Sequence, residues 1–286
     1  MSIRCSDEEI LFLRSWNIIP CDRTGLLSHC LQFQTPNLSV PDKGSPVSLQ
    51  ECIASRCSEL SSLKNPVLMW SGGIDSTLVF YALKERGIRF ECTISEDAKA
   101  EYPRLYEEIR NNEHEGVTPV STKVILEENR SNKIFITGEI GDQIIGTDKF
   151  LTKYTDFNSR SRPAEEEFTS AEYKEYYTAI RKVLRKNDLT VAEFAWALNF
   201  LFKFSHVAHR TRSYFNFKKN EVVHFFLTDM FQRWALHNYE SNVNFDSITD
   251  YKMAYKDYIY NINGDAEYRT NKVKIPSLNG QIGKVA

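Results

Sequence analysis

Apolar residues between positions 49 and 137 recur with two alternating spacings, that of a helix with one buried face and that of a strand buried on both faces. The first helix is expected over 49–62, where Ser48 and Glu51 form the capping box that satisfies backbone N–H groups at a helix start. A continuous apolar run at 66–70 predicts a strand that is buried on both faces, and two further strands are expected at 88–94 and 132–137. Helices are expected between these strands, over 76–87 and 102–113.

This alternation of strands and helices determines the expected fold class. Strands that are separated by helices pair in parallel, through right-handed crossover connections. We therefore expect an α/β fold with a doubly wound parallel sheet over 48–150 and a mainly helical C-terminal half over 151–286. Residues 1–47 end in a stretch rich in Pro, Ser and Gly and are interpreted as an N-terminal appendage.

The helical half carries two signals for helix starts and one for a core. Capping boxes are expected from Thr169 with Glu172 and from Thr190 with Glu193. Apolar residues at helical spacing over 191–202 form a stripe, which is typical of a helix packed into a core.

Composition and charge exclude several classes of protein. Lys and Arg total 36 against 38 Asp and Glu, so no overall field attracts the chain to nucleic acid or to an acidic membrane, and only local basic patches remain open. No window approaches the roughly 18 consecutive apolar residues of a membrane span, and we expect a cytoplasmic protein. The six cysteines include no C-x-x-C pair and are expected to be buried free thiols.

The most informative stretch is LMWSGGIDSTLVF, residues 68–80, in which glycines, a carboxylate and hydroxyls interrupt an apolar run. The strand before it leads into a turn at 71–73, and a helix is expected to begin near Asp75. A glycine turn at a helix N-terminus exposes backbone N–H groups beside the positive end of the helix dipole, so a phosphate is the expected guest. The residues expected to contact it are Ser71, Gly72, Gly73, Asp75, Ser76 and Thr77.

The carboxylate in this loop indicates a metal ion. The Walker pattern G-x-x-x-x-G-K-[ST] is absent, and Asp75 would repel a phosphate unless a cation such as Mg²⁺ lay between them. A second stretch, FITGEIGDQIIG at 135–146, follows the third expected strand and presents Glu139 and Asp142. Because the carboxyl ends of neighbouring parallel strands face the same crevice, we expect Asp75 and Asp142 to share one metal ion.

These two stretches resemble the motifs of a known family, the PP-loop ATP pyrophosphatases. SGGIDS is similar to the S-G-G-x-D-S loop of that family, and GEIGDQ is similar to the G-E-G-G-D-E segment of its asparagine synthetase branch. The resemblance implies an adenine nucleotide α-hydrolase fold and cleavage of ATP between its α and β phosphates. It also implies that Gly138 lies at the nucleotide, that Asp142 helps to bind Mg²⁺, and that Glu139 acts as a general base or positions the substrate.

The resemblance is incomplete at two positions and faint near the C-terminus. Ile140 replaces a glycine of the family segment, and Gln143 replaces its final acid. A third stretch, TNKVKIPS at 270–277, is similar to the R-x-K-x-x-F-like run of asparagine synthetases. Lys272 stands at the lysine position of that run and Ile275 at the aromatic position. The resemblance implies that Lys272 stabilises charge on pyrophosphate and on the acyl-adenylate. Lys274 is the alternative lysine and a further expected nucleotide contact.

The function implied by the resemblance is an ATP- and Mg²⁺-dependent ligase that forms an acyl-adenylate, from which an amine or ammonia displaces AMP to give an amide. Small-molecule carboxylate and amine substrates are expected, with adenine near Trp70 and Ile94. The residues before the loop are too few for a glutaminase domain, so a separate ammonia source is the expected alternative to a free amine. Two other functions stay open, adenylation of a base carbonyl in nucleobase or tRNA modification and a non-catalytic ATP-binding module.

Overall fold

The computed structural model describes residues 22–24, 26–27, 40–127, 131–146, 154, 156–205, 207–208 and 221–272. These residues belong to two compact units, which we call the sheet unit and the helical unit. The described residues of the sheet unit come from Ile53–Gly138, Lys218–Phe225 and Lys252–Ala286, and those of the helical unit come from Met1–Cys52, Glu139–Phe217 and Phe226–Tyr251.

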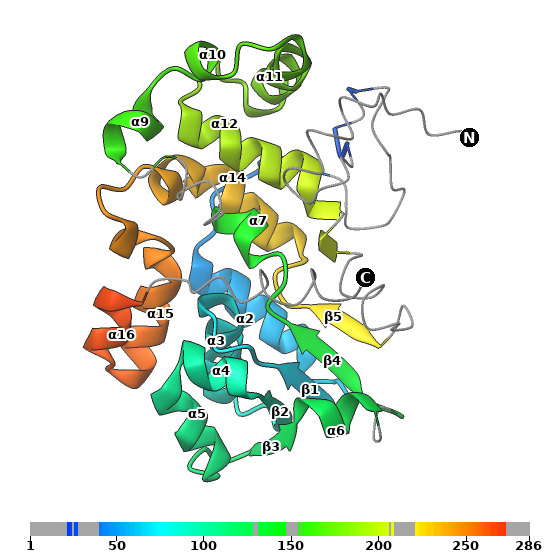
Figure 1. Ribbon diagram of the computed structural model, residues 1–286. Helices are drawn as coiled ribbons and strands as arrows, with labels where there is room; N and C mark the ends of the chain where they lie inside the picture. The colour runs from blue at the N-terminus through cyan, green and yellow to red at the C-terminus, as the bar shows by residue number, and fades with distance from the viewer. Residues whose placement is uncertain are drawn as a thin grey trace, which may run out of the picture. The chain divides into compact units, whose positions relative to one another are not determined.

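Within the residues that the structure describes, the sheet unit contains five parallel strands in the order β3-β2-β1-β4-β5 (Figure 1). They are β1 (Pro66–Met69), β2 (Phe90–Ile94), β3 (Val117–Ser121), β4 (Ile134–Thr137) and β5 (Val222–His224). Leu68 of the central strand pairs with Cys92 on one side and with Ile136 on the other, and all three side chains are fully buried. The expected α/β class with a parallel sheet is confirmed, and so are the three strands expected from the sequence.

The strand order reverses between β1 and β4. The strands β2 and β3 extend the sheet on one side of β1, whereas β4 and β5 extend it on the other. In open parallel sheets, ligands bind outside the carboxyl ends of the strands at such a reversal. The segments at this place are the loop that follows β1 and the residue that follows β4, Gly138. The sheet topology therefore selects the same two stretches that the sequence pattern selects.

The sequence pattern does not indicate β3 or β5. The strand β3 has Pro119 at its centre, where the missing N–H removes a possible ladder bond. An edge strand tolerates a proline, and β3 lies at the edge of the sheet. The strand β5 has three residues, too few for a period-2 pattern, and it lies in the half of the chain that is expected to be mainly helical.

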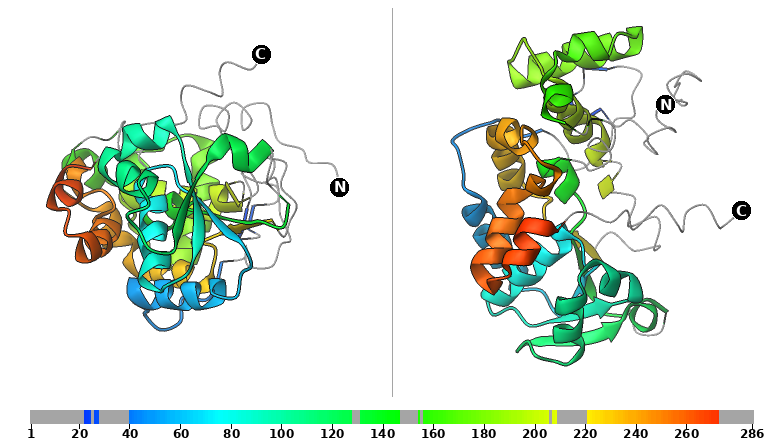
Figure 2. Two further views of the ribbon diagram at one scale, coloured as in Figure 1. Left: turned by 90° about the horizontal axis from the view of Figure 1, so that it is seen from below. Right: turned by 60° about the vertical axis from the view of Figure 1, so that its left-hand side comes forward.

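The helices of the sheet unit bury its strands and one another. They include α3 (Ile74–Glu85), α4 (Glu96–Glu101), α5 (Pro103–Arg110), α6 (Thr122–Glu127), α15 (Met253–Asn263) and α16 (Ala266–Asn271). The helix α3 is apolar on most of its surface because the sheet lies on one side of it and α15 lies beside it (Figure 2). The helices expected over 76–87 and 102–113 correspond to α3 and α5.

The helix α2 (Leu49–Leu60) begins with the capping box that the sequence predicts. The backbone N–H of Ser48 donates to Glu51 Oε2 at 2.7 Å, and the N–H of Glu51 donates to Ser48 Oγ at 3.1 Å. Both bonds satisfy N–H groups that have no partner within the helix, so this prediction is confirmed.

The helical unit packs around α12 (Val191–Leu198). The unit includes α7 (Gly141–Ile145), α9 (Phe157–Ser161), α10 (Ala164–Glu167), α11 (Ala171–Leu184), a π-helix (Asn199–Lys203), α14 (Asp229–Val243) and a 3₁₀ turn (Ile248–Asp250). The helix α12 contacts α9, α10, α11, α14 and the π-helix that follows it. The indole of Trp196 stacks on Phe200 at 4.9 Å and on Tyr239 at 4.6 Å between ring centroids. The stripe expected over 191–202 is core, as predicted, and its end is π-helical.

One of the two capping boxes expected in this unit is wrong. Thr190 and Glu193 form the box at the start of α12, as predicted. The N-cap of α11 is Ser170 rather than Thr169, and it makes no side-chain capping bond. The chain therefore enters α11 one residue later than the pattern of Thr169 indicates.

Two further expectations concern the state of the cysteines and the presence of membrane-spanning segments. Cys52, Cys57 and Cys92 are buried free thiols, as predicted, and burial raises the pKa of Cys52 and of Cys57 to about 12. The other cysteines lie outside the described residues. Among the helices that the structure describes, none combines the length and the apolar character that a bilayer crossing requires.

Candidate functional site

The loop that follows β1, residues 71–73, is closed by the hydroxyl of Ser76. Ser76 Oγ accepts from the backbone N–H of Ser71 at 3.2 Å and donates to the carbonyl of Gly73 at 3.1 Å. Ser71 Oγ lies 3.1 Å from Ser76 Oγ and accepts from the N–H of Gly73. Gly73 is the N-cap of the 12-residue helix α3 and has no side chain to cap it, so the positive end of the helix dipole lies at the loop. The arrangement suits an anion such as phosphate.

Gly72 allows this loop to pass directly against α4. Its φ is +76°, in the left-handed region that favours glycine. A Cβ at this position would lie 2.5 Å from the carbonyl oxygen of Ala98 and 2.6 Å from Cβ of Glu101. Neither atom is the mobile end of a long side chain, so no larger residue fits without moving the loop or the helix.

Gly138 allows an equally close approach after β4. A Cβ on this residue would lie 2.7 Å from the backbone nitrogen of Ser76 and 3.0 Å from the carbonyl carbon of Asp75. The end of β4 therefore passes against the first turn of α3 with no side chain between them. The structure thus brings Gly138 next to the loop that the sequence assigns to the nucleotide.

Thr77 and Trp70 are buried next to the loop. Thr77 is fully buried, and its Oγ1 accepts from Trp70 Nε1 at 3.2 Å. The backbone N–H of Trp70 donates to Thr93 Oγ1 at 3.0 Å, which ties the start of the loop to the strand β2. A phosphate contact for Thr77 and an adenine position near Trp70 and Ile94 stay predictions.

Asp75, in the first turn of α3, forms an ion pair that the sequence does not indicate. Lys252 Nζ lies 2.5 Å from Oδ1 and 2.5 Å from Oδ2 of Asp75. The side chain of Lys252 is 1% exposed, whereas that of Asp75 is 19% exposed. The ammonium group is therefore enclosed by protein, while the carboxylate keeps some access from solvent.

Lys252 is absent from the residues predicted by sequence, although a signal for it is present. The lysine pattern of the resembled family has an aromatic residue three positions after the lysine. Lys252 is followed at that spacing by Tyr255, whereas Lys272 is followed by Ile275. Lys252 Nζ lies 6.0 Å from the centroid of the Tyr255 ring. Lys252 therefore keeps the aromatic position of the pattern that Lys272 lacks.

Lys272, the catalytic lysine predicted from sequence, pairs with Glu101. It is the C-cap residue of α16, and its Nζ donates to the backbone carbonyl and to Oε2 of Glu101, each at 2.5 Å. Both side chains are buried. Because Cβ of Glu101 packs against Gly72, the ion pair lies beside the loop. A catalytic role for Lys272 stays a prediction, and Lys274 lies outside the described residues.

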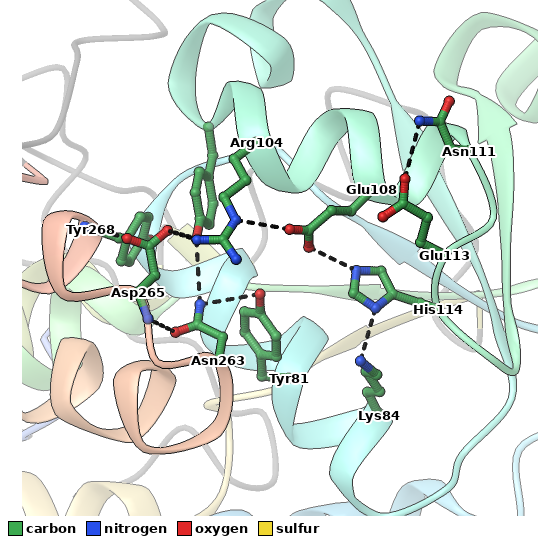
Figure 3. A network of polar contacts seen from close by, with 11 residues as sticks. Tyr81, Lys84, Arg104, Glu108, Asn111, Glu113, His114, Asn263, Asp265 and Tyr268 are labelled. Atoms are coloured by element: carbon green, nitrogen blue, oxygen red, sulfur yellow. Dashed lines mark hydrogen bonds and ion pairs between the residues drawn. The ribbon is translucent and has the colours of Figure 1, made fainter.

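A polar network holds α16 at the start of α5 (Figure 3). Asp265, the N-cap of α16, accepts from the backbone N–H of Tyr268 at 2.9 Å and from the hydroxyl of Tyr102 at 2.8 Å. The rings of Tyr102 and Tyr268 stack with centroids 4.3 Å apart. Burial raises the pKa of both tyrosines, so both remain neutral. The network fixes the short helix whose last turn leads to Lys272.

Glu139 and Asp142 belong to the helical unit, where they flank the start of α7. Asp142 Oδ1 accepts from the hydroxyl of Tyr251 at 3.1 Å. Tyr251 directly precedes Lys252 in the chain, so consecutive residues contact the two acids that the sequence assigns to the metal. The sharing of one Mg²⁺ by Asp75 and Asp142, and the role of Glu139, stay predictions.

Both departures from the family segment have a structural counterpart. Ile140 has a φ of +79°, the conformation that a glycine adopts without strain, and its side chain is 1% exposed. Gln143 is buried, and its Nε2 donates to Asn199 Oδ1 at 3.1 Å. Asn199 also donates to the backbone carbonyl of Asp142 at 2.7 Å. Gln143 therefore helps to hold α7 against the π-helix, while Ile140 adopts a left-handed backbone conformation that favours glycine.

The oxygen donors at the loop suit a hard divalent cation. Mg²⁺ is commonly held by one or two carboxylates, with phosphate oxygens of the substrate and water completing its shell. Asp75 supplies a partly exposed carboxylate at the end of α3 where a phosphate is expected. Within the described part of the chain, no group of three or more His, Cys, Asp or Glu side chains is placed to hold a metal ion.

The fold can be compared with known architectures and known proteins. A parallel sheet with the order β3-β2-β1-β4-β5 is compatible with a Rossmann-like fold or a nucleotide α-hydrolase fold. No protein-family model matches the chain, and neither a curated protein nor a solved structure matches it.

Proposed function

We propose that the protein is an ATP-dependent ligase that activates a carboxylate as an acyl-adenylate. The observation that carries this proposal is the closed loop at 71–73 on the N-terminus of α3, with the carboxylate of Asp75 in the first helical turn. The loop at the positive end of α3 suits a phosphate, and Asp75 suits a cation bound to that phosphate. The place of the loop at the carboxyl end of β1, where the strand order reverses, supports nucleotide binding there.

The proposed reaction has two steps. A carboxylate oxygen of the substrate attacks the α-phosphorus of ATP, the bond from this phosphorus to the bridging oxygen breaks, and pyrophosphate leaves. An amine or ammonia then attacks the acyl carbon, AMP leaves with the former carboxylate oxygen, and the nitrogen loses a proton. The products are an amide, AMP and pyrophosphate.

Residues of the chain would bind ATP and Mg²⁺, orient the substrate and neutralise the negative charge that develops in the reaction. The loop would hold the pyrophosphate part of ATP, and Asp75, together with Asp142 on the resemblance, would hold Mg²⁺. A bound Mg²⁺ supplies positive charge for the departing phosphates. Glu139 would orient the substrate or accept the proton from the amine. A lysine would stabilise the negative charge that develops during both steps.

Among the residues that the structure describes, two lysines are candidates for this last role. Lys252 is supported by its direct contact with Asp75 and by the aromatic residue three positions after it. Lys272 is supported by its place beside Gly72, although its ammonium group is bound to Glu101. We favour Lys252, because its ammonium group contacts a residue of the helix that begins at the loop.

The direct test is to incubate the purified chain with α-labelled ATP, Mg²⁺, pooled carboxylates and pooled amines. We expect AMP and pyrophosphate in equal amounts, formed only when a carboxylate is present. Asp75→Asn is the negative control. Release of ADP instead of AMP would contradict the proposal. AMP formed with nucleobases or RNA but not with carboxylates would indicate adenylation of a base carbonyl, and ATP binding without pyrophosphate release would indicate a non-catalytic module.

A further inference from the structure

The ion pair of Asp75 and Lys252 puts a protein cation on the carboxylate where the proposed function needs a metal cation. We propose that Lys252 is the resident counter-ion of Asp75, and that its ammonium group moves from this carboxylate to the phosphates of the nucleotide when Mg²⁺ and ATP enter together. This inference rests on the proposed function, because the phosphates that receive Lys252 are those of its ATP. Its consequence is an order of binding in which the metal does not enter without the nucleotide.

The geometry makes the two cations mutually exclusive. Lys252 Nζ lies 2.5 Å from each carboxylate oxygen, so it occupies both oxygens of Asp75 at once. A magnesium ion needs a carboxylate oxygen at about 2.0–2.1 Å, which would bring it close to the ammonium group. Like charges at such a distance repel strongly where protein excludes water. The metal can therefore use Asp75 only after Lys252 has left it.

The phosphates of ATP would attract the ammonium group away from Asp75. The side chain of Lys252 is 1% exposed, and a cation that protein shields from water is attracted strongly by a nearby negative charge. Asp75 stands in the first turn of α3, beside the loop that suits a phosphate. The phosphates of ATP therefore offer Lys252 a negative charge close to the one it gives up. Mg²⁺ alone offers it none.

The backbone of Lys252 indicates that this position is held for a reason other than local stability. Lys252 has φ of +57° and ψ of +33°, a left-handed conformation that is uncommon outside glycine, asparagine and aspartate. It is also the N-cap residue of α15, where a positive charge opposes the helix dipole. The contact of α15 with α3 keeps it there (Figure 2). Conformations of this kind concentrate at functional and switching sites.

The test measures binding of Mn²⁺, a spectroscopic substitute for Mg²⁺, by the electron paramagnetic resonance signal of the free ion. The full chain is titrated without nucleotide and with α,β-methylene-ATP, which cannot be cleaved between the α and β phosphates. We expect the nucleotide analogue to tighten Mn²⁺ binding at least ten-fold. Lys252→Met should bind Mn²⁺ at least ten-fold more tightly than the original chain when no nucleotide is present. Lys252→Arg, which keeps the charge, should retain the dependence on nucleotide.

Lys133→Met is the matched control. Lys133 also lies 2.5 Å from a carboxylate, that of Glu91, and both belong to the sheet unit. Its removal should leave Mn²⁺ binding unchanged, which would show that freeing a carboxylate from a lysine does not by itself make a metal site. Circular dichroism establishes that each variant is folded. If Lys252→Met does not fold, Lys252→Gln, which also removes the positive charge, takes its place in the comparison without nucleotide.

Three outcomes overturn the inference. They are tight Mn²⁺ binding through Asp75 without nucleotide, no gain of Mn²⁺ binding in folded Lys252→Met, and no Mn²⁺ binding under either condition. The proposed ligase reaction is judged separately by AMP formation. If the chain forms AMP but fails the Mn²⁺ test, the proposed function is supported and the exchange of ion partners is contradicted. A chain that passes the Mn²⁺ test but forms no AMP keeps the exchange and loses the ligase reaction.

Discussion

A Cβ on residue 138 would lie 2.7 Å from the backbone nitrogen of Ser76, so Gly138 and the first turn of α3 are in direct backbone contact. Gly138→Ala should push the end of β4 away from the loop and disturb the phosphate site. We expect the affinity for ATP to fall at least ten-fold and the free energy of unfolding to fall by about 2 kcal/mol, as for an overpacked core site. Isothermal titration with ATP and urea unfolding measure the two effects.

Gly87→Ala is the matched control for this substitution. Gly87 has a φ of +65°, but nothing lies within 4 Å of the position of an added Cβ. The alanine should therefore cost only backbone strain, about 1 kcal/mol, and leave the affinity for ATP unchanged. Equal ATP affinity in the two variants would contradict the assignment of Gly138 to the nucleotide site.

Ile140 offers a test of backbone strain beside the acids predicted for the site. Its φ of +79° is one that glycine adopts freely, whereas an alanine is strained there. Both Ile140→Gly and Ile140→Ala lose the buried side chain, so their difference reports the backbone alone. We expect the glycine variant to be more stable than the alanine variant by about 1 kcal/mol, the reverse of the usual order. Urea unfolding of the two variants measures the difference, and the usual order would contradict a strained residue 140.

The metal assignment is tested most cleanly at Asp142. In Asp142→Asn the amide oxygen can still accept from the hydroxyl of Tyr251, so the fold should be retained. A carboxylate that binds Mg²⁺ is nevertheless lost, and we expect pyrophosphate release to fall at least about 100-fold. A coupled pyrophosphate assay with Mg²⁺ and ATP measures the rate. A near-normal rate in folded Asp142→Asn would refute its role as a metal ligand.

Asp75→Asn should have the same effect on pyrophosphate release, with an added loss of stability. The neutral amide removes the negative charge that lies 2.5 Å from the buried ammonium group of Lys252. Removing one partner of a buried ion pair costs about 3–5 kcal/mol, and the partial exposure of Asp75 places this case near the lower end. Adding Lys252→Met to Asp75→Asn should recover part of that stability. Thermal unfolding of the single and double variants measures the coupling.

The sequence predicts the centre of the fold better than its edges. The strands β1, β2 and β4 are recognised from short runs rich in apolar residues, because each has a neighbouring strand on both sides in the parallel sheet. At one edge, β3 contains Pro119, which speaks against a strand unless its place at the edge is known. At the other edge, β5 has too few residues to carry a period. A strand at the edge of a sheet can contain a proline or be very short, so the sequence patterns that identify central strands do not identify it.

The candidate site was predictable where it depends on local chain geometry. The glycine turn and its hydroxyls follow from the order of strand, turn and helix, and Gly138 follows from the next strand. The ion pair of Asp75 with Lys252 joins residues 177 positions apart in the chain. Its lysine is a poor N-cap with left-handed backbone, so local propensity argues against the conformation that it adopts. Tertiary contact overrides that propensity, and the local signal for this lysine is Tyr255, three positions after it.

Variants of Lys272 and of its ion-pair partner Glu101 distinguish a catalytic role of Lys272 from a structural one. If Lys272 only neutralises Glu101, then Lys272→Met and Glu101→Gln should each reduce stability by about 3 kcal/mol, and the double variant should recover stability and activity. If Lys272 contacts the substrate, the double variant should recover stability but not kcat. Steady-state kinetics and thermal unfolding of the three variants separate these outcomes. We expect the structural result, because Lys252 contacts the loop helix directly.

His114 should make stability depend on pH through the network at α3 and α5 (Figure 3). Lys84 Nζ donates to His114 Nδ1 at 2.8 Å, and His114 Nε2 lies 3.3 Å from Glu108 Oε2. Burial and then the charge of Lys84 lower the pKa of His114, while Glu108 and Glu113 oppose them in part. A protonated ring could no longer accept from Lys84, whose ammonium group can only donate.

The sign of the effect follows from the lowered pKa. The folded state holds His114 neutral, whereas the unfolded chain protonates it near pH 6.5. The stabilisation is therefore fully present above about pH 6.5 and is lost as the pH falls through that value towards the lower folded pKa. Each unit of difference in pKa is worth about 1.4 kcal/mol. We expect the free energy of unfolding to decrease between pH 7.5 and pH 5.0 in urea titrations.

His114→Asn is the control that isolates this histidine from the carboxylates that also titrate at low pH. The amide oxygen of asparagine can accept from Lys84 close to the place of Nδ1, but it does not take up a proton. The variant should therefore lose part of the pH dependence between pH 7.5 and pH 5.0 while staying folded at pH 7.5. A pH dependence as steep as that of the original chain would show that protonation of His114 does not oppose folding, and that the decline at low pH belongs to other groups.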